Sequence, residues 1–349
     1  MRLDLDTPDA MLLGLTLLGL PLCWLLTALM RRYAVSTELL DHPNDRSSHS
    51  IPTPRGGGVA IVLSFTALAW GSALLGGTPP GLLEALLGSG GLVALVGFLD
   101  DQSPLPARAR FLAHAAASVW SLGFMHGIPP VPVFGVSIDL GWFGLALAAV
   151  YLMWMINLCN FMDGIDGIAS IEAISVSLGG ALCWWLASDT PYWHIPVLFA
   201  ACAAGFLIWN YPPAKIFMGD SGSGFVGMVL GLFSLWTARQ EPLVFWCWFI
   251  LMGCFMVDAT TTLVRRVRRG EPFNEAHRNH AYQYASRVHG SHKVVSLAVG
   301  AINLVWLLPI ALLVALRLLD GVVGTLIAYA PLVWLAFHYK AGDRASQGL

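Results

Sequence analysis

Charged residues are scarce in this chain. Asp, Glu, Lys and Arg make up 11% of its 349 residues, hydrophobic residues make up 56%, and the mean hydropathy is +0.67. An ordinary soluble domain carries roughly a quarter charged residues, so this composition excludes a soluble protein with a large core. The apolar runs also lack the strict alternation of membrane β-barrel strands. We therefore expect an all-α polytopic membrane protein, because backbone hydrogen bonds inside a bilayer must be satisfied in helices or a closed barrel.

Several other features are missing. The six cysteines form no CxxC pair, and each lies in or at the end of an apolar run. They indicate small core residues and argue against a disulfide framework or a zinc site. Residues 1–10 carry three aspartates and lack the basic start of a cleavable signal peptide, so we expect the first apolar run to remain as a span. There is no internal repeat and no second soluble domain, and residues 1–349 are predicted to form one integral membrane domain.

The apolar runs are long enough for about eleven transmembrane helices, since each span needs about 20 mostly apolar residues. The predicted spans are 10–30, 57–76, 81–99, 111–127, 140–157, 168–187, 194–210, 222–238, 243–264, 294–316 and 321–339. After the fourth span, residues 128–139 hold three prolines and a glycine. This composition predicts a short extended loop or hairpin outside the bilayer.

The basic residues set the predicted orientation. With the N-terminus outside, sixteen of the nineteen Lys and Arg residues fall on the inner side of the membrane, and only Arg2, Arg239 and Arg317 fall outside. Because cytoplasmic loops are enriched in Lys and Arg, we expect a periplasmic N-terminus and a cytoplasmic C-terminus. The predicted cytoplasmic loops are 31–56, 100–110, 158–167, 211–221 and 265–293. Aspartates and histidines from distant segments meet on this side, which predicts a site on the cytoplasmic face.

Two cytoplasmic segments combine charge with a helix end. In "HPNDRSSHSIPTPRGGG" (42–58), three glycines allow close backbone approach beside the basic side chains of Arg46, His49 and Arg55. A basic retention loop is the alternative interpretation. In "GFLDDQSPLPARAR" (97–110), Asp100 and Asp101 stand at a helix C-terminus, where negative charge opposes the helix dipole. A divalent metal or the nearby arginines would compensate, although a solvated helix end is also compatible with this pattern.

The segment "NLCNFMDGIDG" (157–167) is unusually polar for so apolar a chain. A spacing of three places Asn157, Asn160 and Asp163 on one side of a helical or 3₁₀ turn, and the glycines let the chain bend so that Asp166 leaves that face. Converging side-chain oxygens are what Mg²⁺ prefers. Polar contacts between spans are the alternative.

Two later segments suit phosphate chemistry. In "KIFMGDSGSGFVG" (215–227), Asp220 lies in a Gly- and Ser-rich turn that opens a helix, where backbone N–H groups suit phosphate and an aspartate suits a phosphate-bound metal. Ordinary helix capping is the alternative. In "EAHRNHAYQ" (275–283), the spacing of His277 and His280 predicts a shared helical face. Two histidines are a weak zinc signal, so we expect imidazolium paired with phosphate. The arginine run at 265–269 is typical of positive-inside anchoring.

Taken together, the segments from Asp41 to His292 resemble the polyprenyl-phosphate N-acetylhexosamine-1-phosphate transferases, also called glycosyltransferase family 4. The resemblance rests on the DD pair, on NxxNxxDGxDG at 157–167, on GDSGS at 219–223 and on HxxH at 277–280, in this order. The muramyl-pentapeptide branch has a run of consecutive histidines, whereas only His277 and His280 stand here. The chain is therefore most similar to O-antigen-initiating transferases that use UDP-GlcNAc or a 6-deoxy relative such as UDP-N-acetylfucosamine.

The resemblance implies the transfer of a sugar-1-phosphate from a UDP-N-acetyl-aminosugar to undecaprenyl phosphate, with release of UMP, at the bacterial inner membrane. It implies that Asp220, Asn160 and Asp163 hold Mg²⁺, with Mn²⁺ as an alternative, and that His277 and His280 hold diphosphate or uridine. Asp100 and Asp101 would contact the attacking phosphate or act as base. The residues expected to contact the substrates are Asn157, Asn160, Asp166, Arg46, His49, Arg55, Arg108, Lys215, Ser221 and Arg278.

Charge neutralisation is expected to matter more than proton abstraction. A lipid phosphate has a second pKa of about 6, so it is already a competent nucleophile at neutral pH, and the harder task is to bring two anions together. A covalent aspartyl-phosphate intermediate is the rival mechanism. Rival functions are wall teichoic acid or peptidoglycan lipid-intermediate synthesis on the same fold, and a transporter. Membrane lipid is an expected partner, nucleic acid is not, and a homodimer is left open.

Overall fold

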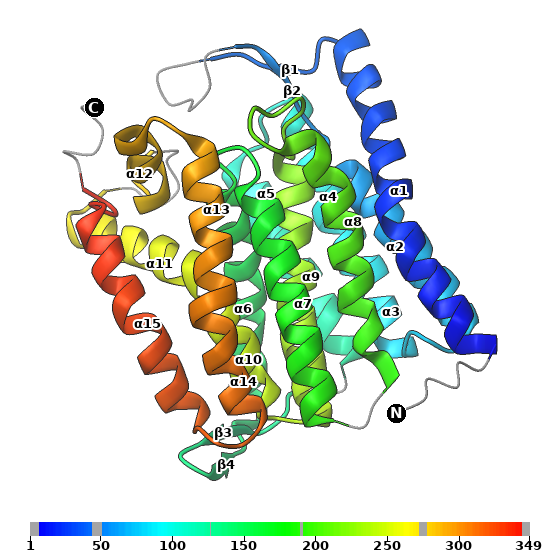
Figure 1. Ribbon diagram of the computed structural model, residues 1–349, viewed down its shortest axis with the longest axis vertical. Coiled ribbons are helices and arrows are strands. Elements are labelled where there is room, and N and C mark those ends of the chain that lie inside the picture. The colour runs from blue at the N-terminus through cyan, green and yellow to red at the C-terminus, as the bar shows by residue number, and fades with distance from the viewer. Residues whose placement is uncertain (1–6, 44–50, 126, 189–190, 272–277, 344–349) are drawn as a thin grey trace.

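The computed structural model describes residues 7–43, 51–125, 127–188, 191–271 and 278–343, and helices dominate them (Figure 1). The helices are α1 (Thr7–Ser36), α2 (Val59–Leu74), α3 (Pro80–Ala85), α4 (Gly91–Gln102), α5 (Ala107–Phe124), α6 (Gly141–Met162), α7 (Ile168–Ala187), α8 (His194–Asn210), α9 (Gly219–Gln240), α10 (Val244–Leu251), α11 (Gly253–Arg268), α12 (Ala281–His289), α13 (His292–Ile302), α14 (Leu308–Ala315) and α15 (Gly321–His338). One-turn π-helical segments join α3 to α4 (Leu86–Gly90) and α13 to α14 (Asn303–Leu307), and a 3₁₀ turn (Pro191–Trp193) precedes α8.

Most of the described residues in each of the eleven predicted spans are helical. Eight described helical segments are long and apolar enough to cross a membrane, and the bent pair α10–α11 makes up to nine. The 16-residue α2 is a shorter apolar helix, and α5 carries Arg108, Arg110 and His114 in its first turns. A multi-pass membrane protein is therefore supported, while the count of eleven crossings and their orientation stay predictions.

Two short hairpins lie at opposite ends of the bundle (Figure 1). Strands β3 (Val131–Val133) and β4 (Val136–Ile138) pair antiparallel, which confirms the predicted hairpin at 128–139. Strands β1 (Leu40–Asp41) and β2 (Thr53–Pro54) pair at the other end, where the sequence indicated only a loop. Three helices also run further than expected at that end, so residues predicted as loop belong to α1, α4 and α6.

Helix α9 forms the centre of the bundle. All of its residues from Ser221 to Ala238 are buried, and α2, α4, α6, α7 and α10 pack around it. Its glycines make this possible: a Cβ at Gly222 would meet the backbone of Gly58, and one at Gly227 would meet the backbone of Met155. Small residues let helix backbones approach closely in membranes, so the Gly- and Ser-rich sequence lets neighbouring segments pack tightly against α9. Asp220 lies at its start, with its side chain 24% exposed.

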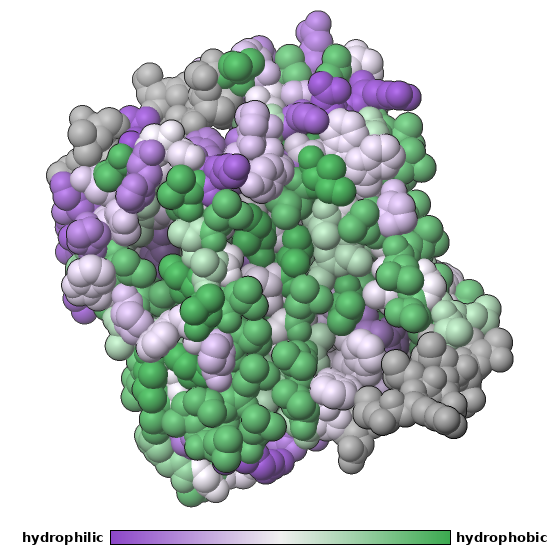
Figure 2. Space-filling view, viewed as in Figure 1, coloured by the Kyte–Doolittle hydropathy of each residue, from purple (hydrophilic) through white to green (hydrophobic). Residues whose placement is uncertain are grey.

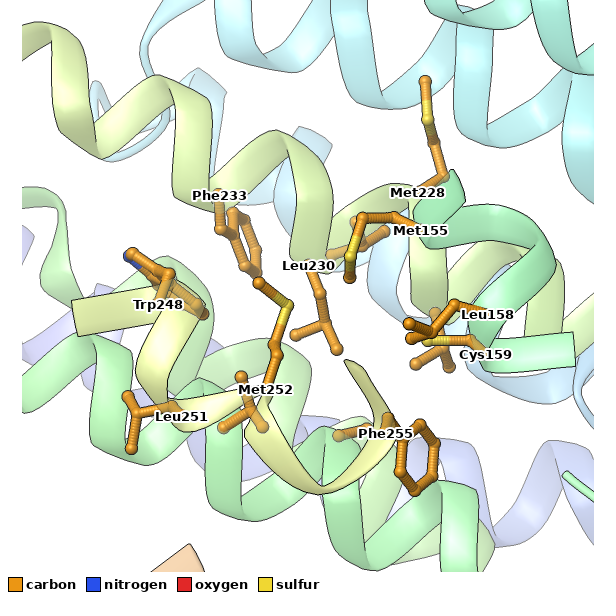
Figure 3. Packing of buried hydrophobic residues seen from close by; sticks show 14 of the residues in the cluster. Met155, Leu158, Cys159, Met228, Leu230, Phe233, Trp248, Leu251, Met252 and Phe255 are labelled. Atoms are coloured by element: carbon orange, nitrogen blue, oxygen red, sulfur yellow. The ribbon is translucent and has the colours of Figure 1, made fainter. Parts of the chain in front are cut away.

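Helices α10 and α11 meet at an angle of 68° at Met252. The predicted span 243–264 is therefore broken. Side chains from α6, α9 and both halves pack around the break, among them Met155, Phe233 and Phe255 (Figure 3). Because of the bend, α11, the more polar helix of the pair, departs from the direction of α10 and approaches α12.

Hydrophobic side chains cover the middle of the surface seen in Figure 2. Hydrophilic side chains gather over the end that holds β1, β2 and α12, and fewer of them appear at the β3–β4 end. This distribution is that of a bundle whose apolar belt contacts lipid.

Candidate active site

A cavity of about 440 Å³ opens between α4, α5, α6, α9 and the start of α12. Its polar lining comes from segments far apart in the sequence. These side chains are Asp100, Arg110, His114, Asn157, Asn160, Asp220, His280, Tyr282 and Gln283. The structure therefore brings together the DD segment, the NxxN segment, the GDSGS turn and the second histidine, as the sequence predicts.

The first turn of α9 is capped by a carboxylate from α4. Asp101 accepts hydrogen bonds from the backbone N–H groups of Asp220 (3.0 Å) and Ser221 (3.3 Å). A carboxylate at a helix N-terminus satisfies donors that the helix itself leaves unpaired. These two amides therefore already have a partner, which corrects the expectation that they cradle phosphate. Ser221, predicted to contact substrate, is 1% exposed and does not line the cavity.

Arg55 joins two of the aspartates. Its Nε lies 2.6 Å from Asp101 Oδ1, and its NH2 donates to Asp220 Oδ1 at 3.1 Å. Burial lowers the pKa of Arg55, but the negative charges of Asp101 and Asp220 outweigh burial and raise it above its ordinary value. The loop before α2 thus supplies a fixed positive charge beside the cavity.

A second arginine serves Asp100. Arg110 NH1 donates to Asp100 Oδ2 at 2.6 Å and lies 3.9 Å from Asp220 Oδ2. Both Arg110 and Asp100 line the cavity. Arg108, the arginine that the sequence analysis assigned to the substrate, is exposed on α5 and does not line it.

The polar end of α6 forms another wall. Asn157 Nδ2 donates to the Met153 carbonyl (2.7 Å), and Asn160 Nδ2 donates to Ser223 Oγ on α9 (3.1 Å). Asp163 ends the helix. Burial and the negative charges of Asp220 and Asp101 raise the pKa of Asp163 well above its ordinary value. The Asp163 carboxyl group therefore lies in a buried environment that also feels the negative charges of Asp220 and Asp101.

Asp166 leaves this group, as the glycine spacing predicts. Its Oδ2 accepts from the backbone N–H of Ala214 (3.0 Å), and its Oδ1 lies 3.3 Å from His292 Nδ1. It does not line the cavity, and instead it ties the 163–167 turn to α13. Lys215 is exposed beside the ring of Trp209, also away from the cavity.

His280 lies immediately before α12, not within a helix. His280 therefore does not lie on a helical face, contrary to the prediction that it shares one with His277. His277 itself lies outside the described residues. His280 Nδ1 is 3.3 Å from Asp258 Oδ1. Arg278 is described, but it does not line the cavity. The predicted substrate contacts Arg46 and His49 also fall outside the described residues.

The donor chemistry fits a hard divalent cation at the aspartates. Asp220, Asp163 and Asn160 offer oxygen atoms as acceptors, which are the ligands that Mg²⁺ prefers, while the Asn160 amide nitrogen donates to Ser223. Burial, and after it the negative charges of Asp220 and Asp101, raise the pKa of Asp163, and a cation would offset the second cause. In the described part of the chain, no three His, Cys, Asp or Glu side chains are already arranged as a metal-binding group, so the metal stays a proposal.

Several residues of the site were not predicted from the sequence. Arg110 was noted only as a possible counter-charge. His114 follows it by four residues and lies on the same helical face, so the spacing alone could have indicated it. Ser223, Asp258 and Tyr282 act through contacts across the bundle, which no local pattern predicts.

Comparison with known proteins identifies the family of the chain. The sequence model of glycosyl transferase family 4 matches residues 83–238. A probable undecaprenyl-phosphate N-acetylglucosaminyl 1-phosphate transferase of Bacillus subtilis is 26% identical over 287 residues, which are 81% of this chain and 79% of that protein. A phospho-N-acetylmuramoyl-pentapeptide-transferase of Moorella thermoacetica is 31% identical over 232 residues, which are 62% of this chain and 69% of that protein. The chain belongs to glycosyl transferase family 4.

The family 4 match spans the carboxylate side of the cavity, from α3 to α9. Asp258 and His280 lie beyond it. A decaprenyl-phosphate N-acetylglucosaminephosphotransferase of Mycolicibacterium smegmatis is also similar, at 28% identity over 76% of this chain and 73% of that protein. Two of these three relatives are thus polyprenyl-phosphate N-acetylglucosamine-1-phosphate transferases, and the third is a phospho-N-acetylmuramoyl-pentapeptide-transferase.

Proposed function

We propose that this protein transfers an N-acetyl-aminosugar-1-phosphate, GlcNAc or a 6-deoxy relative such as FucNAc, from its UDP-sugar to undecaprenyl phosphate. The products are UMP and undecaprenyl-diphospho-sugar, the first membrane intermediate of O-antigen or a related surface polysaccharide. We place the enzyme in the bacterial inner membrane with the cavity on the cytoplasmic side. The observation that carries the proposal is the pairing of Arg55 and Arg110 with three aspartates beside one cavity at the polar end of an apolar bundle.

The reaction joins two anions, and the site supplies charge to allow this. One P–O bond forms between an oxygen of the lipid phosphate and the sugar-linked phosphorus, and the bridging P–O bond to UMP breaks, so that UMP leaves with the bonding pair. Fixed positive charges that meet the developing negative charge stabilise such a transition state. We assign this role to Arg110, which lines the cavity, and to His280 when its imidazole is protonated, while Arg55 contacts Asp220 and Asp101.

Mg²⁺ is the proposed cofactor, held by Asp220, Asp163 and Asn160, with Mn²⁺ as a substitute. A divalent ion here would neutralise phosphate oxygens as charge builds on the leaving group. Asp100 is held by Arg110 at 2.6 Å, which supports a positioning role over that of a proton acceptor. Since the lipid phosphate is mostly a dianion at neutral pH, no base is needed to create the nucleophile.

The identity of the donor sugar is the most specific part of the proposal. Relatives of both kinds match the chain, and the scarcity of histidines around His280 favours an aminosugar without a peptide. The same fold could instead initiate wall teichoic acid or carry peptidoglycan lipid-intermediate synthesis.

The test is UMP release by purified protein in detergent. The donors are UDP-GlcNAc, UDP-GalNAc, UDP-N-acetylfucosamine and UDP-N-acetylmuramoyl-pentapeptide, each with and without undecaprenyl phosphate. We expect lipid-dependent UMP release with a UDP-N-acetyl-aminosugar. Preference for the pentapeptide donor would support the alternative, and no lipid-dependent release with any donor would contradict a transferase and favour transport.

A further inference from the structure

We propose that His114 is an acceptor-binding residue of this reaction, which donates a hydrogen bond to the phosphate of the polyprenyl phosphate. The inference rests on the proposed function, in which a lipid phosphate is the acceptor, and it names the wall of the cavity that receives this phosphate. His114 belongs to α5, is half-buried and lines the cavity.

One face of α5 forms the wall of the cavity on this side. The α5 side chains that line the cavity are Ala107, Arg110, Phe111 and His114. Their spacing of i, i+3, i+4 and i+7 places them on one side of a helix. The next polar residue on this face, Ser118, is 0% exposed and does not line the cavity. His114 is therefore the innermost α5 side chain of the cavity, about 6 Å beyond Arg110 along the helix axis at 1.5 Å per residue.

The imidazole of His114 is not used by the protein. Neither ring nitrogen hydrogen-bonds to a residue that the structure describes, and Ser118 Oγ donates to the backbone carbonyl of His114 (2.8 Å), not to its ring. Polar groups inside a bundle are normally paired, because an unpaired one is costly. A neutral imidazole carries one N–H donor in either tautomer. His114 can therefore donate to a molecule in the cavity without a change of protonation.

The inner part of the cavity is otherwise mostly apolar. Val93 precedes Asp100 by seven residues on α4, so it lies about 10 Å further into the bundle. Ile156 on α6 lines the cavity as well. Its neighbour Asn157 is polar, but Asn157 Nδ2 already donates to the Met153 carbonyl at 2.7 Å. The His114 ring thus offers a free donor among hydrocarbon side chains, beyond the charged groups at the hydrophilic end.

This order of groups matches the acceptor better than the donor substrate. In a polyprenyl phosphate the phosphate is attached directly to a hydrocarbon chain, whereas in a UDP-sugar polar groups flank the diphosphate on both sides. Helix α5 also borders the lipid, since Phe111 is 59% and Leu112 is 67% exposed in the apolar bundle. A lipid phosphate that enters beside α5 keeps its chain against apolar side chains while its phosphate meets His114.

The first experiment measures UMP release while the mole fraction of undecaprenyl phosphate in detergent micelles is varied. His114→Leu removes the donor and keeps a side chain of similar size. We expect it to raise KM for undecaprenyl phosphate about 10- to 100-fold, the range for a lost hydrogen bond to a charged group, and KM for the UDP-sugar less than about 3-fold. His114→Gln supplies an amide N–H and should recover part of the loss. An unchanged KM for undecaprenyl phosphate, or a change confined to the UDP-sugar, would overturn the proposal.

Ser118→Ala is the matched control, because Ser118 lies one turn further along the same face and outside the cavity. It removes only a hydroxyl that donates to the His114 backbone carbonyl, so both KM values should stay at those of the wild type. A lipid KM raised as much in Ser118→Ala as in His114→Leu would trace the effect to the packing of α5 and would overturn the proposal.

Chemical modification of the wild type covers variants that fold poorly and separates this inference from the proposed function. Diethyl pyrocarbonate acylates accessible imidazole nitrogens, and mass spectrometry locates the modified residue. We expect His114 to react in the lipid-free protein. Undecaprenyl phosphate should protect it, and undecaprenol, which lacks the phosphate, should not.

Three results would overturn the inference even if UMP release is normal: a His114 ring that does not react without lipid, no protection by undecaprenyl phosphate, or equal protection by undecaprenol. Protection of His114 that depends on the phosphate, in a protein without UMP release, would retain the lipid-phosphate site and reject the transferase.

Discussion

Arg55 Nε lies 2.6 Å from the carboxylate of Asp101, which at the same time caps the first turn of α9. One aspartate therefore links the loop before α2, the end of α4 and the start of the central helix. The other aspartate of the pair, Asp100, lines the cavity together with Arg110. Two adjacent residues that look equivalent in sequence thus have different surroundings.

Replacement of Arg55 should separate its charge from its geometry. Arg55→Lys keeps the charge but cannot span Asp101 and Asp220 together, because a single ammonium lacks the guanidinium fork. We expect both Arg55→Lys and Arg55→Gln to lower the apparent melting temperature and UMP release, Arg55→Gln more strongly. The loss of folding free energy should be smaller than the roughly 3–5 kcal/mol that follows removal of one partner of a fully buried ion pair, since the Arg55 side chain is 30% exposed. Unchanged melting in Arg55→Gln would contradict the link.

Asp220→Asn should abolish transfer at any attainable Mg²⁺ concentration. The substitution keeps the side-chain shape but removes the charge proposed to hold the metal. The measurement is UMP release across a Mg²⁺ titration, paired with Mn²⁺ binding followed by electron paramagnetic resonance. The variant must melt as the wild type does for the comparison to count. Near-normal turnover, or wild-type Mn²⁺ affinity, would refute the metal assignment.

Asp100→Asn should give a defect that does not depend on pH. Its carboxylate is held by Arg110, so we expect it to position charge and not to remove a proton. The measurement is kcat from about pH 6 to pH 9, where lipid phosphate becomes fully ionised. A defect that eases at high pH would instead identify Asp100 as an obligatory base.

Ionisation of Asp163 should make the metal-free protein less stable as the pH rises. Its folded-state pKa is raised by burial and by Asp220 and Asp101, so the folded protein holds this proton more tightly than the unfolded chain. The resulting stability is present below the ordinary pKa of aspartate and is lost as the pH rises through the raised value. In EDTA, the melting temperature of the wild type should fall relative to that of Asp163→Asn across this window.

Added Mg²⁺ should reduce that difference, because the cation offsets the charge of ionised Asp163. Thermal unfolding in detergent over a pH series, with EDTA or with Mg²⁺, measures both effects. If the melting temperature of the wild type instead rises relative to that of Asp163→Asn as the pH rises in EDTA, the effect has the wrong sign. That result would contradict a raised pKa of Asp163 in the folded protein.

Gly97→Ala should disturb the site through the backbone. A Cβ at Gly97 would meet the backbone of Asp220 and Ser221, so α4 and α9 must separate or shift. We expect a lower melting temperature and a loss of transfer of at least 10-fold. Gly91→Ala on the same helix is the control, because its Cβ meets no atom within 4 Å. Equal behaviour of the two variants would show that close α4–α9 contact is not required.

Much of the site could be predicted because its groups lie in short, dense patterns. Polar residues interrupt apolar sequence in the DD pair, in the NxxNxxD segment and at Asp220. These segments all lie at one end of the bundle. Spacing also predicted that Asp166 leaves the group. Arg108 and Lys215 were also predicted to contact substrate, but both are exposed and neither lines the cavity. Sequence alone does not show whether a basic side chain turns toward a cavity or toward solvent.

The sequence by itself determined the membrane environment, the helical class and the set of acidic and basic groups. Composition and spacing are sufficient for these because they depend only on residues along the chain. Only the tertiary structure decided that Asp101 caps α9 while Asp100 faces the cavity, and that Asp258 lies beside His280. These relationships depend on glycine contacts between helices and on the bend at Met252. The physical reason is that a hydrogen bond joins groups by distance and direction in space, which helix packing sets and local sequence does not.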